Sequence, residues 1–122
     1  MRFLIVSITI VLCISCENPN TQAILGSWQC TEILEEGTPL DLDVSVINFS
    51  FNDANQYTYQ GTLTYKESGA YRLVGNKLYT KDTIDTNALE KLVKITLLTA
   101  DSMSFKMNDA GKERILKLAK TK

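Results

Sequence analysis

The stretch Gln56-Tyr57-Thr58-Tyr59-Gln60-Gly61-Thr62-Leu63-Thr64-Tyr65-Lys66 decides the fold that this sequence predicts. Tyrosine, glycine and leucine alternate along it with glutamine, threonine and lysine, so each side of an extended chain receives one kind of side chain. A helix would distribute the tyrosines around its axis, whereas a strand gathers them on one face. We therefore expect one uninterrupted β-strand with a buried face over residues 56–66.

The segment 47–51 just upstream alternates in the same way and is expected to pair with this strand. The apolar residues of both strands share one face if Phe51 lies opposite Tyr57 and Phe49 lies opposite Tyr59. This register leaves residues 53–55 as a three-residue loop. Asn55 can close the loop because asparagine tolerates the left-handed conformation.

A second hairpin is predicted by Gly75-Asn76, because glycine stands in the first central position of a type II′ turn. The hairpin places Arg72 opposite Tyr79, where a guanidinium can lie against an aromatic ring. The polar residues 81–86 should form a loop, and 87–91 are expected to form one helical turn.

Three further strands complete the pattern. Segments 93–97 and 103–107 carry apolar residues at alternate positions. Pairing them in register places Leu97 opposite Met103 and Ile95 opposite Phe105. Segment 114–119 is the closing strand. About eight strands with short loops and no crossover helix predict an all-β protein, either a small up-and-down antiparallel β-barrel or a small sandwich.

The composition excludes several functions. The chain has 13 basic and 14 acidic residues, so no excess charge favours a nucleic-acid partner. It contains no histidine, the most common general base and zinc ligand. The predicted inner rows hold no carboxylates, and the acidic residues lack the spacing of a calcium loop. We expect no enzyme activity, no cofactor and no metal site.

The first residues of the chain predict where in the cell the protein is located. An apolar run, 3–14, follows a basic residue and is too short to span a bilayer, as in a secretory signal. The run ends in Leu12-Cys13-Ile14-Ser15-Cys16, which resembles the lipobox of bacterial lipoproteins and implies that Cys16 is acylated. Cys13 departs from the pattern, where those proteins usually have leucine, valine or isoleucine. The alternatives are an uncleaved anchor and an ordinary signal with an incidental cysteine.

This resemblance divides the chain into a signal peptide, 1–15, a lipidated cysteine with its tether, 16–23, and a folded domain, 24–122. It implies a bacterial envelope protein on a membrane, in preference the outer membrane, with the domain on the periplasmic or external side. The polar part of the tether, 17–22, reaches only about 20 Å when fully extended. We therefore expect the domain to lie close to the membrane surface.

The tripeptide Gly26-Ser27-Trp28 at the start of the domain resembles the lipocalin opening motif, particularly that of small lipocalin-like domains in bacterial envelope lipoproteins. With the strands that follow, the resemblance covers residues 24–119 and favours the barrel over the sandwich. It implies that Trp28 packs at a closed base and that a basic residue near the last strand, Arg114, packs over it. Cys30 shares the face of Trp28 and should be buried beside it.

Strand directions then predict which loops share an end of the barrel. The first strand leaves the base, so the turns at 53–55, 75–76 and 99–101 should lie at the base. Loop 35–43 and turn 108–112 should lie at the open mouth. Because the tether enters near the base, we expect the base to face the membrane.

The predicted inner rows contain aromatic and methionine side chains that are suited to a pocket for a small apolar ligand. These candidate residues are Phe49, Phe51, Tyr57, Tyr59, Tyr65, Tyr71, Met103, Phe105 and Met107. The alternative is that they simply fill the barrel, since eight strands enclose little more than their own side chains. An open cavity would favour a ligand-binding lipoprotein. A filled barrel would favour a membrane-tethered protein-interaction or inhibitory module.

Overall fold

The computed structural model describes residues 20–121, so the predicted signal peptide and Cys16 lie outside the described residues. A short helix, α1 (Asn20–Ala23), precedes nine strands. The strands are β1 (Gly26–Glu35), β2 (Thr38–Pro39), β3 (Asn48–Phe51), β4 (Gln56–Gln60), β5 (Lys66–Val74), β6 (Lys77–Asp82), β7 (Lys91–Leu98), β8 (Ser102–Asp109) and β9 (Lys112–Lys120). Two 3₁₀ turns lie at Val44–Val46 and Thr62–Thr64. No helix among residues 20–121 is long and apolar enough to cross a bilayer.

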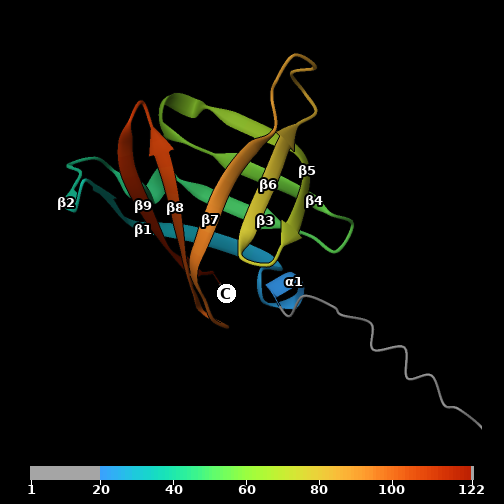
Figure 1. The fold of residues 1–122 in the computed structure, drawn as a ribbon, viewed down its shortest axis with the longest axis horizontal. Coiled ribbons are helices and arrows are strands. Elements are labelled where there is room, and N and C mark those ends of the chain that lie inside the picture. Colours follow the sequence, from blue (N-terminus) through green and yellow to red (C-terminus); the bar gives the residue numbers. More distant parts are fainter. Residues whose placement is uncertain (1–19, 122) are drawn as a thin grey trace, which may run out of the picture.

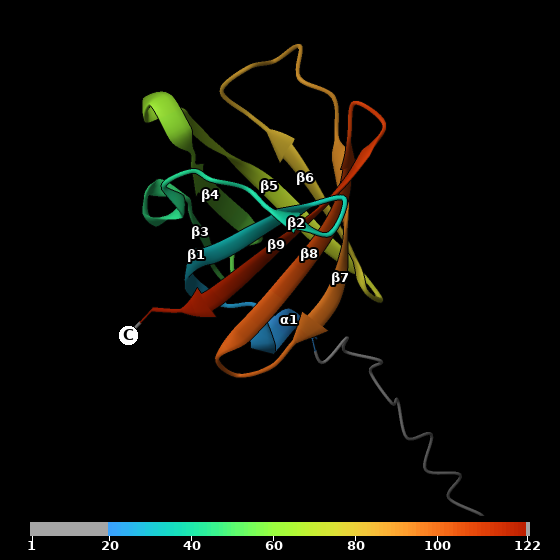
Figure 2. The same cartoon turned by 90° about the vertical axis from the view of Figure 1, so that its left-hand side faces the viewer.

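The predicted barrel is confirmed. Each strand from β3 to β9 pairs antiparallel with the next, β3 pairs with β1, and β9 returns to β1, which closes eight strands into a barrel (Figures 1 and 2). The ninth strand, β2, is an addition. It folds back on the end of β1 and pairs only there, with Leu34 opposite Pro39.

Both predicted hairpin registers are also confirmed. Phe51 lies opposite Tyr57, and Asn55 closes the loop with a φ of 60°. In the hairpin of β5 and β6, Arg72 lies opposite Tyr79, and the guanidinium carbon is 3.9 Å from the centre of the ring.

The prediction of one continuous strand over 56–66 is wrong. β4 ends at Gln60, the 3₁₀ turn reverses the chain, and β5 pairs back on β4 with Glu67 opposite Tyr59. Leu63 and Thr64 make this reversal with φ values of 57° and 58°, and Gly61 leaves room for the Tyr59 side chain, because a β-carbon there would lie 2.6 Å from the Tyr59 hydroxyl. Leu63, expected to point inward, has a φ of 57° and is 96% exposed.

Two later predictions also require correction. Ile95 lies opposite Phe105 as expected, but a bulge follows, so Leu98 rather than Leu97 lies opposite Met103. The extra residue of a bulge shifts every later side chain to the other face, which leaves Leu97 about half exposed. The helical turn expected at 87–91 is absent, because this segment has no apolar face to pack and Lys91 already begins β7.

The base of the barrel is closed around Trp28, which is fully buried. Its indole Nε1 donates to the Ile24 carbonyl at 2.8 Å, and Cys30 is buried beside it as predicted. The basic residue over the ring is Lys120, whose Nζ lies 5.1 Å from the ring centre. The prediction of Arg114 for this role is wrong, because β9 runs antiparallel to β1 and carries Arg114 to the opposite end of the barrel.

The predicted ends of the barrel are confirmed. At the base, the Asn20 side chain donates to the Gly75 carbonyl at 3.1 Å, and the Lys120 amide donates to the Asp101 carbonyl at 2.9 Å. At the mouth, the Glu36 amide donates to the Glu113 carbonyl at 2.9 Å. The orientation of the barrel relative to a membrane remains a prediction.

Gly69 offers a test of the fold, because its backbone lies against that of Lys81 in the neighbouring strand β6. A β-carbon at this position would be 1.9 Å from the Lys81 carbonyl oxygen. We expect Gly69→Ala to lower the free energy of unfolding by about 3 kcal/mol, since the backbone would have to move. Urea denaturation measures the loss, with Ser68→Ala on the same strand as the control. Equal unfolding midpoints for the two variants would contradict the close contact between the backbones of Gly69 and Lys81.

Candidate functional site

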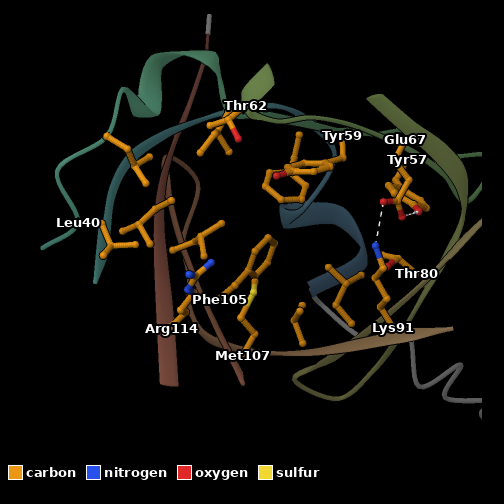
Figure 3. A pocket seen from close by; sticks show the side chains of 17 residues that line it. Leu40, Tyr57, Tyr59, Thr62, Glu67, Thr80, Lys91, Phe105, Met107 and Arg114 are labelled. Atoms are coloured by element: carbon orange, nitrogen blue, oxygen red, sulfur yellow. Dashed lines mark hydrogen bonds and ion pairs between the residues drawn. The ribbon is translucent and has the colours of Figure 1, made fainter. Parts of the chain in front are cut away.

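A cavity of about 310 Å³ lies in the mouth half of the barrel (Figure 3). Most of its wall is apolar: Ile33, Leu40, Leu42, Ile47, Phe49, Leu78, Val93, Phe105, Met107 and Leu116. Polar and charged side chains complete the lining: Tyr57, Tyr59, Thr62, Glu67, Thr80, Lys91 and Arg114. The composition of this wall is that of a small-molecule pocket, with a few polar groups set in an apolar surface.

The candidate residues divide between this cavity and the core below it. Five of the nine line the cavity: Phe49, Tyr57, Tyr59, Phe105 and Met107. Phe51, Tyr71 and Met103 are buried outside its lining, and the rings of Phe51 and Tyr71 pack edge to face at 5.1 Å. Tyr65 is half exposed. The barrel is therefore filled in one half and hollow in the other.

The aromatic wall of the cavity is built from three strands. Phe49 of β3 contacts Tyr59 of β4 at a ring separation of 4.7 Å and Phe105 of β8, edge to face, at 5.5 Å. Aromatic pairs in these geometries contribute roughly 0.5–1.5 kcal/mol beyond the burial of their area. The three rings fix one another and form a preformed apolar surface.

Sequence reasoning missed a buried carboxylate, Glu67, which lies on β5 directly opposite Tyr59 of β4. Its side chain is 4% exposed and accepts hydrogen bonds from Tyr57 Oη, from Tyr65 Oη at 3.0 Å and from Lys91 Nζ at 3.0 Å. The expectation that no carboxylate lies inside the barrel is therefore wrong. Counting back by twos from the inward Tyr71 would have found Glu67, but the expected strand ended at Lys66, so Glu67 was assigned to no strand.

The hydrogen bonds determine the charge of this network. Burial alone would raise the pKa of Glu67, but the donors Tyr57, Lys91 and Tyr65 outweigh burial and hold that pKa below its ordinary value. Burial and the bond to Glu67 raise the pKa of the Tyr57 hydroxyl. At neutral pH the network thus consists of a carboxylate, neutral tyrosines and a lysine ammonium.

A second charged cluster lies on the β9 side of the mouth. Arg114 Nη1 is 2.9 Å from Asp109 Oδ2, and its Nη2 is 3.6 Å from Glu35 Oε2. Lys112 Nζ is 3.6 Å from the other oxygen of Glu35. Figure 3 shows Phe105 and Met107 between Arg114 on one side and the Glu67–Lys91 pair on the other.

The sequence profile of the lipocalin-like domain matches residues 24–105. The chain belongs to the lipocalin-like family. This confirms the resemblance inferred from the opening tripeptide. A crystal structure of a lipocalin-like protein from Bacteroides uniformis has the same fold, with a TM-score of 0.61 and 16% identity over 81% of this chain and 99% of that one. No curated protein sequence matches this chain.

The charged groups that line this lipocalin-like cavity are paired with one another. The carboxylate of Glu67 already accepts three hydrogen bonds, and the carboxylates near Arg114 are paired with cations. Within residues 20–121, no three potential metal ligands lie close enough together to hold an ion. The cavity offers apolar surface and a few hydrogen-bonding groups at its sides.

Glu67 gives this lipocalin-like barrel a testable pH dependence. Because its folded-state pKa is depressed, its contribution to stability is present above the unfolded-state pKa of about 4.3 and is lost as the pH falls through the folded-state value. We expect Glu67→Gln to cost about 2 kcal/mol at neutral pH, since the tyrosine and lysine donors lose a charged acceptor. The cost should shrink in acid, and thermal unfolding at several pH values measures it.

Glu90→Gln is the matched control for this experiment. Glu90 forms an exposed ion pair with Arg72 at 3.1 Å. Exposed pairs of this kind contribute only about 0–1 kcal/mol. Equal losses from the two variants at neutral pH, or a loss for Glu67→Gln that does not change with pH, would contradict the assigned network.

Proposed function

We propose that this lipocalin-like protein binds a small, mainly apolar molecule in the cavity at the mouth of its barrel. The observation that carries the proposal is the hollow mouth half, whose mainly apolar wall lies above the buried side chains of Trp28, Phe51 and Tyr71. Small-molecule sites are typically concave, largely preformed and mainly apolar. Transfer of apolar ligand surface out of water provides the driving force, about 25 cal/mol per Å².

The charged groups of the cavity favour binding over catalysis. Both cations that line it are paired with carboxylates: Lys91 lies 3.0 Å from Glu67, and Arg114 lies 2.9 Å from Asp109. Groups held in such pairs are poorly placed to exchange protons with a ligand, because each pair would first have to separate. We therefore propose a binding protein rather than an enzyme.

Neighbouring residues of β7 allow a matched test. Val93 lines the cavity, whereas Leu92 is half exposed on the outer face. We expect Val93→Trp to weaken binding of the neutral fluorophore N-phenylnaphthylamine roughly tenfold or more, since the indole would occupy the ligand volume. Leu92→Trp should leave the affinity unchanged. Fluorescence titration measures both.

The outcomes of this titration are distinct. Unfolding midpoints establish that both variants are folded. Equal affinities for the two variants would mean that the fluorophore binds elsewhere and would count against the cavity. No binding to the wild-type protein would remove the support for ligand binding by this fold.

A membrane-tethered interaction or inhibitory module is the second candidate. It is favoured by aliphatic side chains on two loops, one between β4 and β5 and one between β6 and β7: Leu63 is 96% exposed, Leu89 85% and Ile84 70%. Figure 2 shows both loops at the same end of the barrel. Large apolar side chains left in water can form part of a contact surface with another protein. Val93→Trp separates the two functions, because it would block the cavity without changing these loops.

We also propose that the protein is a lipid-anchored component of the bacterial cell envelope, held through Cys16. The lipobox resemblance at Cys16 and the polar tether support this address. Helix α1 lies at the base of the barrel, so a tether that enters there would direct the base toward the membrane and the mouth away from it (Figure 1).

The two cysteines of the opening segment provide a matched test of the anchor. Cys16→Ala should abolish incorporation of labelled palmitate and move the protein to the soluble fraction, because the acyl chains hold it to the bilayer. Cys13→Ala should keep both the label and the membrane association. Equal label on wild type and Cys16→Ala would refute acylation at this residue.

A further inference from the structure

The cavity wall presents two hydroxyl groups that have no partner in the described part of the chain. Tyr59 Oη and Thr62 Oγ1 both line the cavity, and neither forms a hydrogen bond with any of residues 20–121. The Tyr59 hydroxyl is accessible from the cavity. Both groups can therefore bond to a molecule that occupies the cavity.

The position of the Tyr59 hydroxyl is fixed by its surroundings. The ring contacts Phe49 at a separation of 4.7 Å and Tyr65 at 5.9 Å. Its oxygen lies against the backbone of Gly61, where a β-carbon would approach it to 2.6 Å. Thr62 follows Gly61 in the chain, so the two hydroxyls lie at the same corner of the mouth (Figure 3).

The other polar groups of the cavity wall already have partners. Tyr57 and Lys91 donate to Glu67. Arg114 is held by two carboxylates. Burial raises the pKa of Tyr57, and the Thr80 hydroxyl, which lies against the Tyr57 oxygen, opposes that rise. The corner of Tyr59 and Thr62 is thus where the wall offers unused hydrogen bonds.

This corner carries no charge at neutral pH. Burial and the charge of Glu67 raise the pKa of Tyr59, so its hydroxyl stays protonated and can donate. A charged ligand group would lose its hydration on entering the cavity and would meet no unpaired opposite charge there. An uncharged oxygen can bond to both hydroxyls without that cost.

We infer that the ligand is an uncharged amphiphile whose oxygen group, a hydroxyl or a carbonyl, bonds to Tyr59 and Thr62. This inference rests on the proposed function and specifies the ligand class. The apolar part lies along Phe49 and Phe105, which continue the aromatic surface from Tyr59. Because Thr62 is exposed at the mouth, the oxygen end of the ligand faces outward and the apolar end faces the interior.

The test compares four compounds with the same number of carbons: octanol, methyl hexyl ketone, octanoate and octane. Each is used to displace N-phenylnaphthylamine from wild type, Tyr59→Phe, Thr62→Val and Thr58→Val. The first two variants each remove one hydroxyl and keep the shape of the side chain. Thr58→Val is the control, because Thr58 does not line the cavity and its hydroxyl bonds to Ser50. Unfolding midpoints establish that every variant is folded.

We expect Tyr59→Phe to weaken the binding of octanol, of the ketone or of both roughly tenfold, since one hydrogen bond inside the cavity is lost. Thr62→Val should weaken it roughly threefold, because water reaches this hydroxyl at the mouth. Neither variant should weaken the binding of octane, and Thr58→Val should change no affinity. The compound that loses more affinity identifies the oxygen group that the site takes.

Other results overturn the inference in distinguishable ways. Equal losses for octane and for the oxygen compounds in Tyr59→Phe would show that the ring, not its hydroxyl, matters. Tighter binding of octanoate than of octanol by wild type would show that the site selects an anion. If wild type binds the fluorophore but neither oxygen compound displaces it, the ligand class is wrong. If the fluorophore does not bind wild type, the proposed function itself fails.

Discussion

The pairing of β9 with β1 is the constraint on which the rest of the structure depends. It closes the sheet, and by its antiparallel register it sets Lys120 beside Trp28 at one end and Arg114 beside Glu35 at the other. The glycine of the opening motif fits this register, since a β-carbon at Gly26 would lie 2.9 Å from the Lys120 side chain. One strand pair thus positions both the cation that covers the base and the cation that lines the cavity.

Closure also divides the interior into two halves with different roles. In the base half, Trp28 and the edge-to-face pair of Phe51 and Tyr71 fill the space between the strands and account for much of the buried core. In the mouth half, the inner positions include the charged residues Glu67, Lys91 and Arg114. These side chains form ion pairs and do not pack into an apolar core. Ion pairs lie on two sides of the hollow, Arg114 with Asp109 on one side and Lys91 with Glu67 on the other (Figure 3).

The sequence predicted the hairpin registers because these depend on alternation and turn chemistry alone. The corner after β4 was missed because apolar and polar residues alternate with the same phase before and after it. The alternation alone therefore does not reveal that the chain reverses there. Glu67 was missed because the expected strand ended at Lys66, whereas β5 begins there and continues to Val74. The bulge after Ile95 was missed for a related reason: it changes the phase without changing the composition. The lipocalin resemblance implied that a basic residue packs over Trp28, but it did not give the register of β9 against β1. Arg114 was therefore assigned the position that Lys120 occupies.

Both described ends of the chain lie at the same end of the barrel. The Thr121 amide donates to the Ser27 carbonyl at 2.9 Å, and Lys120 Nζ reaches the Ala23 carbonyl at 3.5 Å, so the last strand and the opening helix are joined there (Figure 1). Sequence fused to either end would therefore emerge away from the opening of the barrel. The domain can be immobilised on a solid support, or linked to a second domain, with its solvent-facing aperture left unobstructed for exchange.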